Sequence, residues 1–136
     1  FMILAEEAAR LVNGVPEYDP MLCEYHHRGK ADSPSGTALR TAERVVAALE
    51  RKKSIQTETL HRRVEPEEFH VASVRGGAIP GTHTLTLDSA ADSIEITHRA
   101  RSRGGFADGA VMAAEWLRRK RGFYGVEDFL KELMNR

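Results

Sequence analysis

The sequence predicts an α+β fold, in which a small mixed or antiparallel sheet of about four strands has helices packed on one face. Two long segments, 35–53 and 106–120, carry apolar residues at helical spacing, and three β-rich segments lie between them. At 136 residues the chain is long enough for one domain with a substantial core. We therefore expect a single domain over residues 1–136.

The first two predicted elements are a helix over residues 1–12 and a strand over residues 20–27. The apolar residues of the helix are Phe1, Leu4, Ala8, Leu11 and Val12. Their spacing is helical and ends at Asn13-Gly14. The second segment, PMLCEYHH, is short and mixes apolar with aromatic residues, which favours a strand that ends at His26 and His27.

The clearest helix spans residues 35–53. Its apolar stripe consists of Ala38, Ala42, Val45, Val46 and Leu49. Ser33 or Ser35 can cap this helix, and Pro34 lies near its start. Residues 53–67 are polar and charged, which indicates a surface connection.

The second half of the chain predicts strands and then helices. The strands are expected at residues 69–75, 83–89 and 93–101, and the helices at 106–120 and 125–136. Residues 75–81, RGGAIPG, form a glycine-rich bend between the first two of these strands. The inner face of the helix over 106–120 is predicted at Ala110, Val111, Ala114 and Leu117.

Alternation over residues 83–99 predicts a sheet with two unlike faces. One face carries Leu85, Leu87, Ile94 and Ile96, and the other carries Thr84, Thr86, Glu95 and Thr97. If helices cover the apolar face, the other face is available for symmetric pairing between subunits.

Composition narrows the classes of function. Acidic and basic side chains balance at 20 each, so net charge points to neither nucleic acid nor a membrane surface as a partner. The one cysteine, Cys23, excludes an intrachain disulfide and fits a cytoplasmic setting. No apolar run approaches membrane-spanning length. Because the sequence opens at Phe1, we expect it to be a piece of a longer polypeptide.

The loop that follows the strand over 20–27 is the main candidate site. It reads HHRGKADSPSGTA and gathers two histidines, an arginine and a lysine ahead of a helix N-terminus. Such an N-terminus presents free N–H groups to an anion, Gly36 lets a ligand approach the backbone, and Thr37 adds a hydroxyl group. Lys30 and Arg28 add charge. The same residues also fit an ordinary capped helix start that follows a solvated loop. Composition alone supports this interpretation and the anion-site interpretation equally.

A metal site is disfavoured. Neighbouring residues on a strand face opposite sides, so His26 and His27 cannot both aim at one ion unless the chain turns there. A zinc site would need a third ligand from His61, His70, His83 or His98, and no spacing supports one. We interpret His83 and His98, in alternating strands, as structural histidines.

The loop resembles the signature of the dihydrodipicolinate reductase family, E-x-H-H-x-x-K-x-D-A-P-S-G-T-A, which the chain matches as EYHHRGKADSPSGTA. VASVRGGAIPGTHT is similar to the family's R-x-G-x-I-x-G-x-H-T segment, and IEITHRARSRGGFADGAV to its L-E-I-T-H-x-A-x-S-R-x-x-F-A-x-G-A segment. GFYGVEDFL resembles its closing helix. The chain departs from the family at Ser33, where alanine is usual, and at Ala78 and Thr82, where acidic residues are common.

The resemblance implies that this chain is the C-terminal, substrate-binding and tetramerisation domain of a two-domain reductase. Members begin with a dinucleotide-binding domain, and no strand–GxGxxG–helix pattern occurs here. The family reduces a cyclic imine dicarboxylate on the diaminopimelate route to lysine with NADPH or NADH. Cofactor-binding residues are therefore expected to be absent from this chain, and residues 1–136 alone to be inactive.

The resemblance also implies roles for particular residues. His26 is the catalytic proton donor or acceptor, Lys30 is the accompanying proton donor, and His27, Gly36 and Thr37 bind the dicarboxylate. Asp32 is expected to hold the loop or to pair with a base, and Arg103 to approach the cofactor. The implied partners are the small-molecule substrate and further copies of the chain in a homotetramer, with no nucleic acid and no membrane.

Two other functions fit the same residues. One is a stand-alone dicarboxylate-binding module that never meets a nucleotide. The other is an oxidoreductase of the same build that acts on another anionic imine or aldehyde, because the loop does not define the whole pocket.

Overall fold

The computed structural model describes residues 1–134 of the chain. Its elements are α1 (Met2–Val12), β1 (Asp19–His26), α2 (Gly36–Ala48), β2 (Ser54–Gln56), β3 (Glu68–Arg75), β4 (Thr82–Asp88), β5 (Ser93–Arg99), α3 (Gly104–Leu117) and α4 (Val126–Met134). Contacts divide them into two compact units, one from Phe1 to Arg101 and one from Ser102 onward. The last two residues of the predicted closing helix, 135–136, lie outside the described residues.

The first unit is built on a five-stranded mixed sheet in the order β2-β3-β1-β4-β5. The pairs β2–β3 and β1–β3 are parallel, whereas β1–β4 and β4–β5 are antiparallel. The predicted α+β class is thus confirmed, but the count of about four strands is wrong by one. The additional strand, β2, lies in the segment predicted as a surface connection. Three residues are too short to show a period, and β2 exists because Ile55 pairs with Phe69 of β3.

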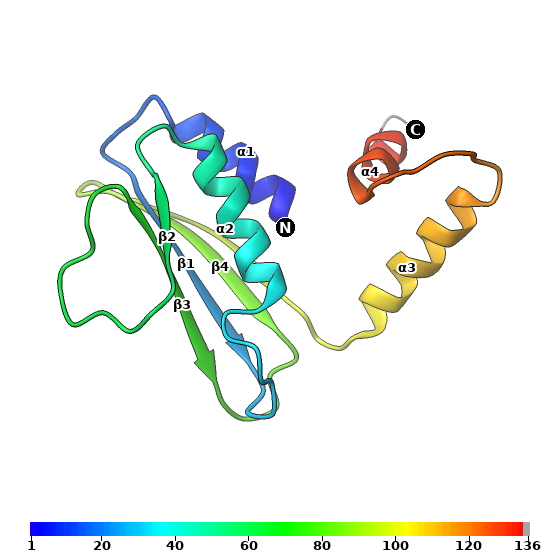
Figure 1. Ribbon diagram of the computed structural model, residues 1–136, viewed down its shortest axis with the longest axis horizontal. Helices are drawn as coiled ribbons and strands as arrows, with labels where there is room; N and C mark the ends of the chain where they lie inside the picture. Colours follow the sequence, from blue (N-terminus) through cyan, green and yellow to red (C-terminus); the bar gives the residue numbers. More distant parts are fainter. Residues whose placement is uncertain (135–136) are drawn as a thin grey trace. The chain divides into compact units, whose positions relative to one another are not determined.

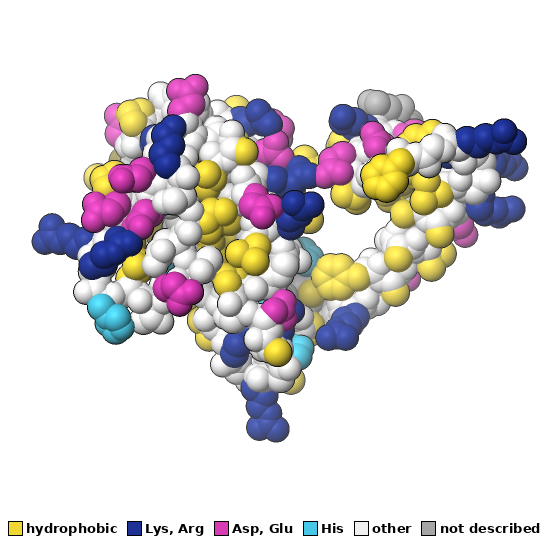
Figure 2. Space-filling view, viewed as in Figure 1, with side chains coloured by type: hydrophobic (Ala, Val, Ile, Leu, Met, Phe, Trp, Pro, Cys, Tyr) yellow, Lys and Arg dark blue, Asp and Glu magenta, His cyan; other side chains and the backbone are white. Residues whose placement is uncertain are grey.

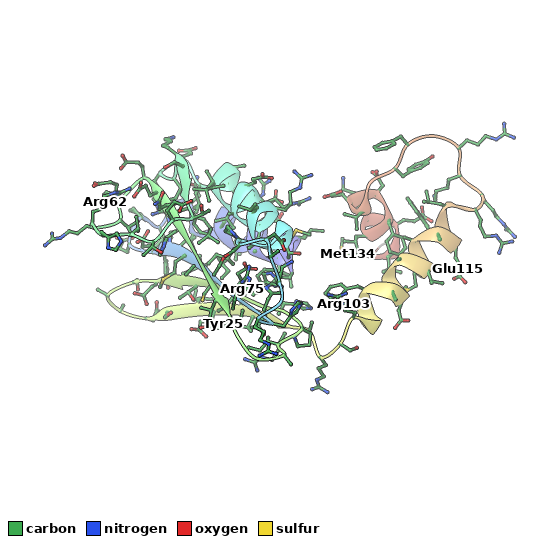
Figure 3. The ribbon with its side chains drawn as sticks, turned by 60° about the horizontal axis from the view of Figure 1, so that its bottom comes forward. Tyr25, Arg62, Arg75, Arg103, Glu115 and Met134 are labelled. Atoms are coloured by element: carbon green, nitrogen blue, oxygen red, sulfur yellow. The ribbon has the colours of Figure 1, made fainter. Side chains whose placement is uncertain are left out.

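Helices α1 and α2 lie together on one face of this sheet, and within the first unit no helix lies on the opposite face (Figures 1 and 3). The core between the helices and the sheet consists of Ala5, Ala9, Val12, Leu22, Ala38, Ala42, Val45, Leu49, Phe69, Val71, Leu85 and Leu87. The predicted alternation is therefore confirmed on β4, where Leu85 and Leu87 are buried and Thr84 and Thr86 face the other way. This arrangement leaves one face of the sheet open.

Only part of the predicted apolar stripe of α1 packs into or against the core. Leu4 and Leu11 are 63% and 81% exposed, whereas Ala5, Ala9 and Val12 are buried. Small side chains at the contact allow α1 and α2 to approach closely, which a count of apolar spacing does not reveal. Helix α2 begins as predicted but ends at Ala48, because the next residue is extended and points into the core.

The second unit pairs α3 with α4 around aromatic contacts. Trp116 packs edge-on against Tyr124 and at a tilt against Phe129, with ring centroids 5.4 Å apart in both cases. The predicted inner face of α3 is wrong, because Val111 and Leu117 are 59% and 42% exposed. The helix is apolar on several sides, and the position of Trp116 against α4 decides which side is covered.

Charged side chains of both signs are interspersed over the visible face of the first unit, as the balanced composition leads one to expect (Figure 2). Among the described residues, no helix has both the length and the apolar character needed to cross a membrane.

Candidate functional site

Two loops meet where the parallel strands β1 and β3 end. The Gly76 N–H donates to the His26 carbonyl at 2.9 Å, and the Arg28 N–H donates to the Gly77 carbonyl at 3.2 Å. The carboxyl ends of parallel strands lie at the same edge of a sheet, so both loops fall at one edge. The basic loop predicted from sequence therefore has a defined partner, the glycine-rich bend.

Glu24 on β1 lies at the centre of this edge and is fully buried. One carboxylate oxygen, Oε1, accepts hydrogen bonds from the Ser35 N–H at 2.8 Å, from Ser73 Oγ at 2.9 Å and from Arg75 Nη2 at 2.7 Å. The other oxygen, Oε2, accepts from the Ser35 hydroxyl and lies 3.4 Å from His83 Nε2. Burial raises the pKa of Glu24, but the hydrogen bonds from His83, Ser35 and Arg75 outweigh it and hold this pKa well below its usual range. The carboxylate is therefore ionised at neutral pH.

His26 ends β1 two residues after Glu24, so both side chains lie on the same face of the strand. The imidazole is almost buried, with its Nδ1 3.1 Å from Glu24 Oε2, although no aligned hydrogen bond joins the two. Burial lowers the pKa of His26; Glu24 opposes this, and His83, Lys30 and Arg75 add to it. The neighbouring carboxylate thus supplies the interaction that favours a protonated His26.

The other ring nitrogen of His26 faces the glycine-rich bend. Gly81 has φ +156°, and a Cβ atom there would lie 3.1 Å from His26 Nε2. A side chain at this position would crowd the nitrogen and strain the backbone. Glycine therefore leaves space beside the nitrogen that faces away from Glu24.

The N-terminus of α2 is held at the same edge by Glu24. Ser35, and not Ser33, is the N-cap, since its Oγ accepts from the Ala38 N–H at 3.2 Å. Ser35 also donates twice to Glu24, which ties the start of the helix to β1. A Cβ atom at Gly36 would meet nothing within 4 Å, so the approach to the first turn is open. The N–H groups of Gly36 and Thr37 belong to that turn and lack partners within the helix.

Lys30 and His27 lie on the loop that joins β1 to α2. Lys30 Nζ contacts Asp32 Oδ1 at 2.7 Å, which agrees with the expectation that Asp32 pairs with a base. Its backbone N–H donates to the His27 carbonyl at 3.1 Å. Arg75 Nη2, labelled in Figure 3, donates at 2.7 Å to the Asp32 carbonyl as well as to Glu24, so it links the loop to the buried carboxylate. Arg103 is the N-cap residue of α3, in the second unit.

Three potential metal ligands gather in this network. One atom each of Glu24, His26 and His83 lie within 4.8 Å of one another. The Arg75 guanidinium already neutralises Glu24, and both carboxylate oxygens receive protein donors. These interactions oppose a cation at the same place. We therefore interpret the trio as a network of charges and hydrogen bonds.

Sequence reasoning missed Glu24 and Arg75 and took His83 for a structural residue. The signal for Glu24 was present, because in LCEYH a strand places Leu22, Glu24 and His26 on one face. A carboxylate beside a buried leucine requires a counterion. Arg75 and His83 come from other strands, and their pairing with Glu24 appears only in the folded sheet.

Comparison with known proteins gives the ancestry of this arrangement. The family described as dihydrodipicolinate reductase, C-terminus, matches residues 1–130. The chain belongs to the dihydrodipicolinate reductase C-terminal family. The basic loop, the glycine-rich bend and the N-terminus of α2 are thus parts of a known family architecture.

Curated relatives of this family domain carry one name, 4-hydroxy-tetrahydrodipicolinate reductase. The protein from Christiangramia forsetii is 39% identical over 98% of this chain and 54% of its own length. Those from Archaeoglobus fulgidus and Syntrophotalea carbinolica are 40% and 44% identical over 96% of this chain and cover 52% and 49% of their own lengths. The chain therefore spans about half the length of the curated relatives that it matches.

A solved dihydrodipicolinate reductase from Paenisporosarcina sp. TG-14, described as dipicolinate-bound, has the same fold. It aligns with a TM-score of 0.67 and 21% sequence identity over 93% of this chain and 50% of its own.

Proposed function

We propose that this chain is the substrate-binding half of an NAD(P)H-dependent reductase that acts on 4-hydroxy-tetrahydrodipicolinate in the diaminopimelate route to lysine. One observation carries the proposal: a single buried carboxylate, Glu24, contacts both the N-cap of α2 and the imidazole of His26. An open anion-binding helix end and a proton donor are thereby held at the same edge of the sheet. The name shared by the curated relatives supports the proposal.

The chain's own residues would bind the dicarboxylate and protonate it. The N–H groups of Gly36 and Thr37 donate hydrogen bonds to a substrate carboxylate at the positive end of α2. Lys30 adds a full positive charge and a second proton donor. His27, on the same loop, also binds the substrate. His26 supplies a proton to the ring carbon next to the reduced position, a step that a well-placed acid accelerates by about 10²–10⁴-fold.

We propose that the cofactor, NADPH or NADH, is bound by a part of the protein outside this chain. Within residues 1–134, no strand leads through a G-x-G-x-x-G turn into a helix, so the residues present do not fit a dinucleotide of the usual kind. Residues 1–136 alone are then expected not to oxidise a nicotinamide cofactor. A cytoplasmic location, inferred from the one cysteine, also belongs to this proposal.

We further propose that copies of this chain associate through the open face of the sheet into a homotetramer. Met21, Tyr25 and Val74 are 45%, 38% and 45% exposed there. Tyr25 and Val74 are register partners on adjacent strands, so they form one apolar surface. An antiparallel or mixed sheet with an apolar uncovered face commonly pairs with a second copy.

Binding of pyridine-2,6-dicarboxylate tests the substrate site. In calorimetry on the complete protein, Lys30→Ala should weaken binding by about 1.5–3 kcal/mol, because a charged hydrogen-bond donor is lost. Lys53→Ala, at an exposed lysine after α2, is the matched control and should bind like the parent. Equal binding by Lys30→Ala and the parent would place the dicarboxylate elsewhere. Binding without turnover of any nicotinamide cofactor would favour a stand-alone dicarboxylate-binding module.

A further inference from the structure

The buried pair formed by Glu24 and His83 makes no contact with substrate in the binding and proton-transfer steps proposed above. Glu24 receives its donors from α2, β3 and β4, and it is 0% exposed, so no substrate can reach it. Its Oε2 nevertheless lies 3.1 Å from Nδ1 of His26. Apart from holding the start of α2 through Ser35, the carboxylate can therefore act on the reaction only through that imidazole.

The two nitrogens of His26 lie in different surroundings. Nδ1 is buried and has no aligned hydrogen-bond partner among the described residues, while Glu24 Oε2 is the anionic atom beside it. Nε2 faces Gly81, the residue whose missing side chain leaves space there. A proton on Nδ1 is thus stabilised by the carboxylate, and Nε2 is the nitrogen left to exchange a proton.

We propose that Glu24 is a positioning residue, which keeps a proton on Nδ1 of His26 so that Nε2 donates the proton in the reaction. This inference rests on the proposed function. When the imidazolium gives up its Nε2 proton, the neutral ring that remains carries its hydrogen on Nδ1, toward Glu24. The same carboxylate therefore stabilises the imidazolium of His26 before the transfer and the neutral ring with its hydrogen on Nδ1 after it. Catalytic triads use a buried carboxylate behind an imidazole in the same way.

The charged groups around His26 come from four parts of the first unit. Glu24 lies on its own strand, His83 on β4, Arg75 on β3 and Lys30 on the following loop. Glu24 is the only anion among these four, and the other three disfavour a positive imidazole. Loss of Glu24 and loss of His83 should therefore move the titration of His26 in opposite directions.

Nitrogen-15 NMR of histidine in the complete protein, without substrate, tests the tautomer directly. His26→Gln assigns the signals by their loss. The neutral form of His26 should carry its hydrogen on Nδ1, and a neutral ring protonated on Nε2 would overturn the inference. This measurement on the unaltered protein needs no variant of Glu24 that folds.

Kinetics supply a second test. Glu24→Gln should lower kcat at least about tenfold while KM changes less than about threefold, because the glutamine oxygen can still accept from the Ser35 N–H and hold the start of α2. Activity requires protonated His26, so the alkaline limb of its pH profile should move to lower pH in Glu24→Gln and to higher pH in His83→Gln. Glu68→Gln is the control. It removes a glutamate of β3 that pairs with Arg62, and kcat and the pH profile should stay unchanged.

The outcomes separate this inference from the proposed function. If the parent reduces the substrate but Glu24→Gln keeps its kcat and its alkaline limb, Glu24 only holds the fold together and the inference is wrong. If the parent fails to reduce the substrate, the proposed function is wrong, and the NMR measurement still decides whether Glu24 directs the proton on His26.

Discussion

Glu24 shows how a single residue joins stability to function. Arg75, whose side chain is 16% exposed, has this carboxylate as its counterion. Glu24→Gln should lower the free energy of unfolding by about 3–5 kcal/mol, because it leaves a mostly buried cation without its anion. Urea unfolding at neutral pH measures the loss. Glu68→Gln faces a half-exposed arginine, Arg62, and should lose much less. Equal losses in the two variants would contradict the importance given to the buried network.

The same residue predicts how stability depends on pH. The pKa of Glu24 in the folded chain lies below its unfolded value of about 4.3, so its contribution is complete above that pH and is lost as pH falls. The hydrogen bond from Arg62, which is the larger cause, and that from the Glu65 N–H lower the pKa of Glu68 to about 2. The contribution of Glu68 to stability is therefore also lost as pH falls. Unfolding measured from pH 5 to pH 2 should show a shallower decline in Glu24→Gln than in the parent. Parallel curves would contradict the depressed pKa.

The glycine-rich bend is the element that gives His26 its space. Gly81→Ala places a Cβ atom 3.1 Å from His26 Nε2 at a φ of +156°, so the ring must move. If His26 is the proton donor as proposed, its displacement should lower kcat about 10–100-fold. Gly76→Ala is the matched control on the same bend, because its Cβ would meet nothing within 4 Å and its φ is not positive. A Gly81→Ala enzyme with full kcat would show that the position of Nε2 is not critical.

At the scale of the whole molecule, the open face of the sheet predicts self-association. Sedimentation of the complete protein should give an assembly, and Val74→Asp should dissociate it, because a charge would be buried between the paired sheets. Val64→Asp changes a similarly exposed valine, 40% against 45%, on the loop between β2 and β3, and should leave the assembly intact. A parent protein that sediments as a monomer, or a Val74→Asp variant that still assembles, would refute pairing through this face.

Much of the fold could be predicted because its signals are local. One strand, β4, contains the whole alternation, in which Leu85 and Leu87 alternate with Thr84 and Thr86. The burial of these side chains follows the same alternation. The apolar stripe of α2 and its cap at Ser35 are likewise local. Elements with weaker local signals were missed or misplaced, among them the three-residue strand β2 and the covered faces of α1 and α3.

The elements of the candidate site could be identified from the sequence alone: a basic loop, the histidine pair and a capped helix start that follows them in the chain. Their order along the chain, and the resemblance of that order to a known family, needed no coordinates. The buried residues that support these elements became visible only in the folded structure. Glu24, Arg75 and His83 lie on three strands and meet only when β1 takes its place between β3 and β4. A contact between distant segments depends on which strands become neighbours in the sheet, and the periodicity of each single segment does not contain that order.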